Sequence, residues 1–154
     1  MPDFWLDNEK MIIRRAKLKD LKEIAEIFRI ESARHPYNKK KTPKKALEGI
    51  REDFKGNDLY VALADNRVVG FVMVKIDSGM KNQLYINELW ISKDYQGQGI
   101  GNNLMNEIEK IYKKKGIGIF KLVAHTGKGG ARDFYKKLNY KTDISMVFME
   151  KRVG

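Results

Sequence analysis

The sequence predicts a mixed α/β fold in which a mostly antiparallel central sheet carries helices on both of its faces. Two stretches have apolar residues at helical spacing, and runs rich in β-branched and aromatic residues, separated by short turns, dominate the middle of the chain. Strands in the middle with helices around them indicate this layered architecture. A length of 154 residues suits one hydrophobic core, so residues 1–154 are predicted to form a single domain, with 1–10 as a candidate N-terminal extension.

The first third of the chain is predicted to form a short strand and two helices. The strand spans 11–15, and the first helix runs over 18–32 until His35-Pro36 ends it. A second helix begins at Thr42-Pro43 and reaches about residue 54, because threonine is a favoured N-cap and proline suits the first helical position. The apolar stripe of the first helix marks its core face: Leu21, Ile24, Ala25 and Phe28.

The middle third is predicted to form an antiparallel meander. The runs 59–64 and 68–76 are rich in strand-forming residues, and Asp65-Asn66-Arg67 between them is typical of a hairpin turn. A second turn at 78–82 leads into another apolar strand over 84–91.

The last third is predicted to alternate between helix and strand. A helix over 102–115 has one apolar face and ends at Gly116, which is a common helix stop. A strand at 121–124, a short helix at 131–138 and a final strand over 140–149 follow.

The loop between the 84–91 strand and the 102–115 helix has the composition of a phosphate-binding turn. Glycines 97, 99 and 101 remove the Cβ atoms that would hold backbone N–H groups away from a bulky anion. The N-terminus of the next helix then offers unpaired N–H groups and a positive dipole end. Neither the dinucleotide fingerprint nor the P-loop pattern fits, and a simple tight turn is the alternative.

Two motifs together resemble one family. The loop reads Q-x-x-G-x-G from Gln96 to Gly101, and residues 131–140 read A-x-x-F-Y-x-K-L-x-Y. This order is similar to that of the GNAT superfamily of acetyl-CoA-dependent N-acetyltransferases, over about residues 12–148. The resemblance implies acetyl-CoA as cosubstrate and no metal. It also implies the residues that bind the coenzyme: backbone groups of Leu89, Trp90 and Ile91, the loop residues Gln96, Gly97, Gln98, Gly99, Ile100, Gly101 and Asn102, and also Lys128 and Tyr135.

The resemblance also places a catalytic acid and leaves the base open. Tyr135 matches the family's general-acid position, and the alternative is a core tyrosine that packs beside its helical neighbours. Glu88 is the carboxylate of the strand before the loop and is the predicted base, although it could instead be an exposed or ion-paired strand residue. Strand alternation places Ile86, Glu88 and Trp90 on one face, and His125 is a reserve candidate for the base.

The chain departs from the family pattern at two positions. Lys128 stands where an asparagine commonly contacts the coenzyme, and a lysine cannot accept a hydrogen bond as that amide does. Asn139 replaces the usual glycine, which is tolerable because asparagine also enters the left-handed region.

Composition limits the other function classes. A net charge of +11 attracts anions, but the lysine-rich stretch 39–45 lacks interleaved aromatic residues and is interpreted as a solvated face, which does not favour a nucleic-acid ligand. The chain contains no cysteine, so acyl transfer would have to be direct, and two distant histidines do not predict a zinc site. No apolar stretch predicts a membrane span or a signal peptide, which favours a cytoplasmic protein.

The leading hypothesis is an N-acetyltransferase that moves acetyl from acetyl-CoA to a primary amine by direct attack in a ternary complex. A non-catalytic acyl-CoA-binding sensor or scaffold and a nucleic-acid binder are the alternatives. The acceptor could be a small molecule or a protein, and lysines 39–45 near the acceptor would favour a neutral or acidic one over a polyamine. Phe4, Trp5 and Leu6 could pack on their own domain or on another copy, so both a monomer and a homodimer remain open.

Overall fold

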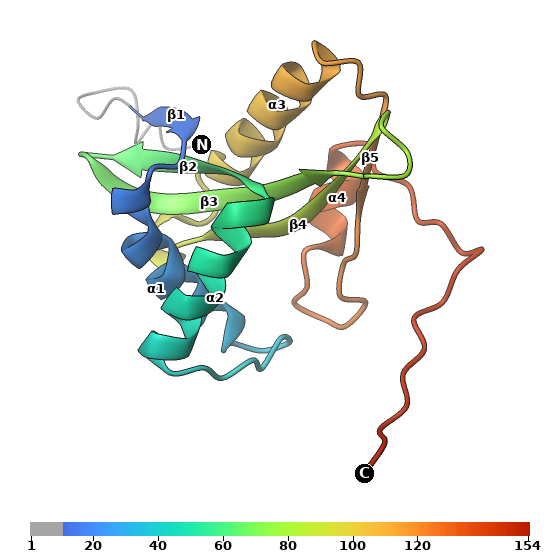
Figure 1. The fold of residues 1–154 in the computed structure, drawn as a ribbon, viewed down its shortest axis with the longest axis horizontal. Helices are drawn as coiled ribbons and strands as arrows, with labels where there is room; N and C mark the ends of the chain where they lie inside the picture. The colour runs from blue at the N-terminus through green and yellow to red at the C-terminus, as the bar shows by residue number, and fades with distance from the viewer. Residues whose placement is uncertain (1–10) are drawn as a thin grey trace.

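The computed structural model describes residues 11–154, which are built around one five-stranded sheet (Figure 1). The predicted N-terminal extension, with Phe4, Trp5 and Leu6, lies outside the described residues. Short 3-10 helices at Leu18–Asp20 and Lys93–Tyr95 precede the first and third α-helices. The elements follow in the order β1 (Ile12–Arg15), α1 (Leu21–Ser32), α2 (Pro43–Gly56), β2 (Asp58–Ala64), β3 (Arg67–Ile76), β4 (Gln83–Ile91), α3 (Ile100–Lys113), β5 (Ile119–Leu122) and α4 (Arg132–Lys137).

The sheet has the spatial order β1-β2-β3-β4-β5, and its neighbouring strands are antiparallel except for β4 and β5, which are parallel. The predicted mixed fold with a mostly antiparallel sheet is therefore confirmed. At the β2–β3 hairpin, Asp65 and Asn66 have φ angles of 48° and 62°, which the favoured two-residue hairpin turn requires. Thr42 caps α2 as predicted, because its hydroxyl accepts a hydrogen bond from the Lys45 N–H at 3.2 Å.

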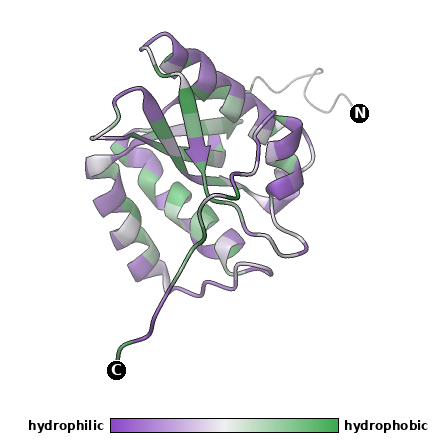
Figure 2. Cartoon of the chain, turned by 90° about the vertical axis from the view of Figure 1, so that its right-hand side faces the viewer, coloured by the Kyte–Doolittle hydropathy of each residue, from purple (hydrophilic) through white to green (hydrophobic). Residues whose placement is uncertain are grey.

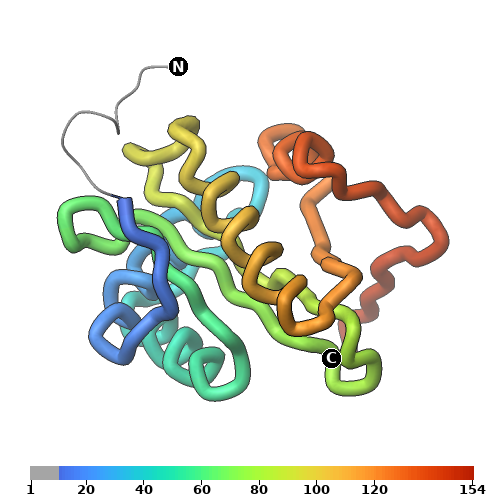
Figure 3. The backbone as a smooth tube through the Cα atoms, turned by 90° about the horizontal axis from the view of Figure 1, so that it is seen from above, coloured from blue at the N-terminus to red at the C-terminus, as the bar shows by residue number. Residues whose placement is uncertain are grey.

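Helices cover both faces of the sheet. α1 and α2 pack on one face with Leu59, Val61 and Phe71, whereas α3 lies across the other face with Val72 and Leu84 (Figures 1 and 3). Because both faces are covered, β2 and β3 are buried along nearly their whole length, which explains their continuous apolar sequences. No helix within residues 11–154 combines the length and apolar content needed to cross a membrane.

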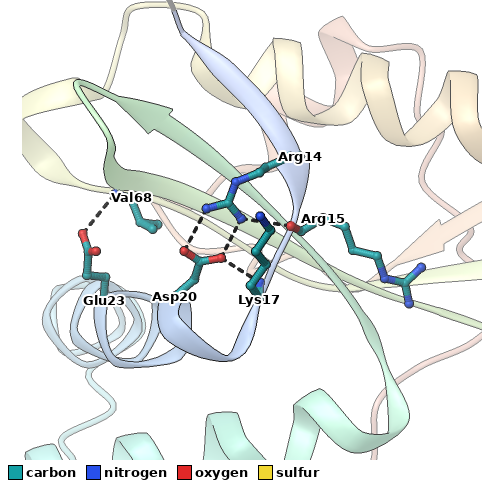
Figure 4. A network of polar contacts seen from close by, with 6 residues as sticks. All are labelled: Arg14, Arg15, Lys17, Asp20, Glu23 and Val68. Atoms are coloured by element: carbon teal, nitrogen blue, oxygen red, sulfur yellow. Dashed lines mark hydrogen bonds and ion pairs between the residues drawn. The ribbon is translucent and has the colours of Figure 1, made fainter.

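A polar network fastens the start of α1 to the sheet (Figure 4). The Arg14 guanidinium donates to both carboxylate oxygens of Asp20 at 2.7 and 3.0 Å, and the Lys17 N–H donates to the same carboxylate at 2.7 Å. Burial by itself would raise the pKa of Asp20, but these partners hold it below its usual range. The Val68 N–H donates to Glu23 at 3.0 Å, so α1 is also tied to the start of β3.

The predicted strand over 140–149 is wrong for the single chain. After α4, Asn139 adopts a left-handed φ of 68° and the Tyr140 N–H donates to the Tyr135 carbonyl at 3.0 Å, which ends the helix. Residues 140–154 then run extended, without a strand partner among the described residues. The sequence pattern indicates a preference for the extended conformation, but a β-strand also needs a neighbouring strand for its backbone hydrogen bonds.

Candidate active site

A cleft opens where β4 and β5 separate. The two strands pair only from Gln83–Ile119 to Ile86–Leu122, and beyond this point β4 pairs with β3 alone. The β4 edge over residues 87–91 that faces β5 therefore has no strand partner within residues 11–154. The cleft has a volume of about 570 Å³, within the range of small-molecule sites. Of the residues predicted to bind coenzyme, it is lined by Leu89, Trp90, Ile91, Gln96, Gly97, Gly99, Ile100, Gly101, Asn102 and Tyr135.

Two glycines of the loop require a backbone conformation that other residues rarely adopt. Gly97 has a φ of 75°, and Gly99, at the N-cap of α3, has a φ of 82°. A Cβ at either position would meet no atom within 4 Å, so the space in front of the loop is open. The first N–H groups of α3 have no intrahelical partner and lie at the positive end of its dipole, so this loop is suited to hold an anion such as a diphosphate.

The third glycine of the motif serves packing. A Cβ on Gly101 would come within 3.2 Å of the Phe134 ring, so its absence lets α3 approach α4. Ile100 is only 1% exposed and belongs to the core with Leu104. The loop motif therefore combines an open turn that is suited to an anion with a close contact between two helices.

The glutamine side chains of the motif brace the loop. Gln96 donates through Nε2 to the Ile91 carbonyl at 2.8 Å and to the Glu31 carboxylate at 3.3 Å. Gln98 donates to the Asp94 carbonyl at 3.2 Å and does not line the cleft. These side chains hold the loop against the end of β4 and the end of α1.

Tyr135 lies in a wall shared by two cavities. It is 9% exposed and lines both the cleft and a smaller adjoining cavity of about 80 Å³. Burial raises the pKa of its phenol well above the usual range, and the nearby Tyr37, Tyr140 and Glu88 add to this effect. The phenol is therefore kept protonated, as a proton donor must be before it acts.

Glu88 lines the smaller cavity and is held by its neighbour on the same strand. The Trp90 indole N–H donates to its carboxylate at 2.5 Å. Burial raises the pKa of Glu88, while the Trp90 hydrogen bond and the charges of Lys39 and Lys41 act in the opposite direction. Glu88 is thus a half-buried carboxylate whose pKa is raised, which suits a general base.

A β-bulge corrects the predicted alternation along β4. Met73 pairs with Glu88 and Val74 pairs with Ile86, so Asn87 is an extra residue on β4. Ile86 consequently faces the α3 side of the sheet, whereas Glu88 and Trp90 face the α1 and α2 side. The prediction that all three share one face is wrong, because an inserted residue reverses the period-two pattern.

Tyr37 is a site residue that sequence reasoning missed. It follows α1, packs edge-on against Trp90 with ring centroids 4.8 Å apart, and has a hydrogen bond with the Ala131 backbone. It lines both cavities, so it joins the α1–α2 connection to the start of α4. A single aromatic residue in a lysine-rich loop carries no periodic signal that could have identified it.

His125 and Lys128 lie in the loop that follows β5. The Gly127 N–H donates to His125 Nδ1 at 2.8 Å, and the ring lies 6.0 Å from Tyr37 in the smaller cavity. Lys128 is exposed and does not line the cleft, although its neighbours Gly129 and Gly130 do. Within residues 11–154, no group of three or more His, Cys, Asp or Glu side chains could hold a metal ion.

Comparison with known proteins agrees with this geometry. Residues 24–140 match the Acetyltransferase (GNAT) family, and the chain belongs to this family. A spermidine N(1)-acetyltransferase from Thermoplasma acidophilum is 31% identical, with 91% of this chain and 96% of the relative aligned.

Solved structures support the fold. A possible acetyltransferase from Clostridium difficile 630 has a TM-score of 0.77 at 24% identity, over 93% of this chain and 99% of the other. An aminoglycoside N-acetyltransferase solved in complex with CoA has a TM-score of 0.75 at 15% identity, over 95% and 97% of the two chains. The predicted family and fold are therefore confirmed.

Proposed function

We propose that this protein transfers an acetyl group from acetyl-CoA to a primary amine by direct attack within a ternary complex. The observation that carries the proposal is the position of Tyr135 in the wall between the large cleft and the cavity that contains Glu88. A buried phenol and a half-buried carboxylate thereby line the same small cavity. Family membership supports the reaction class, and a structural neighbour binds CoA.

The cleft suits coenzyme A in two respects. A Cβ on Gly97 or Gly99 would meet no atom within 4 Å, so the loop leaves room for a diphosphate beside the first N–H groups of α3. The free edge of β4 over residues 87–91 can pair with the amide groups of an extended pantetheine arm as an added strand does. An N–H of this edge would then polarise the thioester carbonyl.

The proton transfers can be assigned to the two side chains. Glu88 takes a proton from the acceptor ammonium, and the freed amine attacks the thioester carbonyl. As the C–N bond forms and the C–S bond breaks, Tyr135 donates its phenolic proton to the departing sulfur. Tyr135 regains a proton from the nitrogen of the new amide, and Glu88 releases its proton to solvent.

The local hydrogen bonds favour Glu88 over His125 as the base. The lone pair of His125 Nδ1 already accepts the Gly127 N–H, so the neutral ring carries its proton on Nε2 and has no free acceptor nitrogen. The Trp90 N–H donates to Oε2 of Glu88, so the other carboxylate oxygen is not used in this contact and can accept a proton.

The acceptor chemistry has two candidates. The charges of Lys39 and Lys41 reach Glu88, which supports an acceptor of low positive charge because a polyamine would be repelled. The similarity to a spermidine N(1)-acetyltransferase favours a polyamine instead.

The decisive experiment measures free thiol release from acetyl-CoA over a panel of amines. The panel contains spermidine, an aminoglycoside and an acidic dipeptide with a free N-terminus, and the Tyr135→Phe variant serves as control. Turnover that depends on the amine and on Tyr135 supports the proposal. Tight acetyl-CoA binding without turnover on any acceptor would overturn it in favour of a sensor or scaffold.

A further inference from the structure

The connection between α1 and α2 carries a dense cluster of positive charge close to the smaller cavity. Residues 34–45 are hydrophilic throughout (Figure 2). Among residues 11–154, none of the five exposed lysines in this stretch forms an ion pair with a carboxylate. A cluster of one sign attracts anions and repels cations. The lysine cluster consists of Lys39, Lys40, Lys41, Lys44 and Lys45.

Contacts with α1 hold the first part of the cluster next to Glu88. The Lys39 N–H donates to a carbonyl at the end of α1 at 2.8 Å, and Lys41 Nζ lies 4.3 Å from the centre of the Phe28 ring. The Phe28 ring packs edge-on against Trp90, whose indole N–H donates to Glu88. The site therefore has a negative pole at Glu88 and a positive pole at Lys39 and Lys41.

Asp53 on α2 offsets part of this positive charge. Burial raises the pKa of Asp53, and the nearby ammonium of Lys41 acts in the opposite direction. The two groups are near each other but do not form an ion pair, and Asp53 is half-buried whereas the lysines of the cluster are exposed. The cluster consequently keeps an excess of positive charge on the side that faces solvent.

The smaller cavity has room for only the reacting end of an acceptor. Its volume is about 80 Å³, whereas sites that enclose a whole small molecule have about 300–1,000 Å³. One water-sized group needs about 10–15 Å³, so the cavity holds an amine and a few atoms beside it. The rest of the acceptor must lie on the surface around the cavity. The lysine cluster belongs to this surface, because it begins two residues after Tyr37, which lines the cavity.

We infer that the acceptor is an acidic peptide segment, whose N-terminal amine enters the smaller cavity while the carboxylates of its next residues bind the lysine cluster. The inference rests on the proposed acetyl transfer and names its acceptor. The two poles of the site match the ammonium and the carboxylates of such a peptide. A nucleic acid would satisfy the lysines but offers no aliphatic amine to acetylate.

The chemistry of the base favours an N-terminal amine over a lysine side chain. The ordinary pKa of an α-amine is about 8, whereas that of a lysine is about 10.4. Glu88 is a carboxylate, so it removes a proton more easily from the less basic of the two amines.

Fluorescence anisotropy without acetyl-CoA tests the docking by itself. Two peptides with a C-terminal fluorophore begin with alanine, which is followed by glutamates in one and by glutamines in the other. The glutamate peptide should bind on the order of 5- to 20-fold more tightly at low salt, and added salt should reduce this difference. Equal affinities would overturn the inference. Single-stranded DNA that binds more tightly than the glutamate peptide would assign the lysine cluster to a nucleic acid instead.

Charge reversal tests whether the lysine cluster itself makes the contact. Lys39→Glu combined with Lys41→Glu should abolish the preference for the glutamate peptide. Lys113→Glu combined with Lys114→Glu makes the same change in net charge at the exposed end of α3, and this control should keep the preference. An equal loss in both double variants would mean that only the net charge matters, which would refute the docking.

Mass spectrometry after incubation with acetyl-CoA separates the docking from the reaction. Both peptides now carry a lysine at the far end, and the acetyl group should appear on the N-terminal amine, faster in the glutamate peptide. Acetylation of the lysine instead would overturn the assignment of the amine. Preferential binding without any transfer would sustain the docking and refute the proposed function. Equal transfer to both peptides would sustain the proposed function and refute this inference.

Discussion

The two halves of the site are built in different ways. The proposed coenzyme half is mostly backbone: residues 96–102 form one continuous loop and helix start, in which the Gln96 and Gln98 side chains brace the turn and Ile100 enters the core. The proposed acceptor half is made of side chains from separate segments, with Tyr37 after α1, Glu88 on β4, His125 after β5 and Tyr135 on α4.

This difference predicts that the two halves respond differently to amino-acid substitutions. A backbone site tolerates changes in side-chain chemistry but fails when the backbone conformation is lost. A site of converging side chains keeps its shape when one functional group is removed, but loses the chemical step which that group performs. Four predictions test the contrast.

The largest effect is expected for Gly99→Val. A β-branched residue is strained at a φ of 82°, which should cost about 1–2 kcal/mol of stability and displace the loop amides. Loss of the bound thioester would forfeit an effective molarity of about 10⁵ M or more, so turnover should vanish. Calorimetric titration with coenzyme A measures the binding. Gly118→Val, where a Cβ also meets no atom and φ is not in the left-handed range, should bind normally; equal binding by both variants would contradict the assignment.

Tyr135→Phe should reduce kcat by roughly 10²- to 10⁴-fold, because the phenolic proton is lost while the ring still fills its place. The affinity for acetyl-CoA should stay unchanged, which separates this variant from Gly99→Val. Steady-state kinetics and calorimetry measure the two quantities. Tyr140→Phe removes a neighbouring phenol whose ring centroid is 5.7 Å away, and it should retain activity. Undiminished turnover in Tyr135→Phe would rule out the acid role.

Glu88→Gln should reduce turnover by about 10²-fold and remove a pH dependence. The parent rate should rise with pH as Glu88 loses its proton, because its pKa is raised by burial, and the variant should lack this rise. The contribution of Glu88 to the stability of the parent should fall as pH rises, whereas the parent rate should increase. A raised pKa in the folded state stabilises the parent below the ordinary carboxyl pKa, and this contribution is lost as pH rises through the folded value.

At neutral pH the Glu88→Gln variant should therefore unfold at a higher temperature than the parent. Thermal unfolding at several pH values measures this shift, and the exposed Glu52→Gln variant is the matched control. A pH–rate profile identical to that of the parent would remove Glu88 from the role of base.

The smallest effect is expected from Lys39→Gln combined with Lys41→Gln. These exposed charges contribute about 0.2–1 kcal/mol each at most, so KM for spermidine should fall by only a few-fold at low salt. Added salt should erase the difference, because exposed charges are screened. Lys44→Gln with Lys45→Gln is the control pair from the same stretch of the chain. An equal response of both pairs would mean that Lys39 and Lys41 do not act on the acceptor.

Local signals in the sequence predicted the elements whose causes are local. The Asp65-Asn66 turn, the Thr42 cap and the glycine loop each depend on residues a few positions apart. The extra residue at Asn87 could not be predicted, because a bulge depends on the register with β3. Tyr37 was missed for a similar reason, since its role arises only when α1 and α4 come together.

The sequence by itself determined the order of helices and strands as far as α4, the left-handed glycine turn before α3 and the family, because these follow from short-range conformational preferences and contiguous motifs. Only the tertiary structure decided which face of β4 carries Glu88, which residues share the cavity with Tyr135, and that residues 140–154 have no strand partner within their own chain. Those features depend on contacts between segments far apart in the chain, which residue-by-residue patterns do not encode.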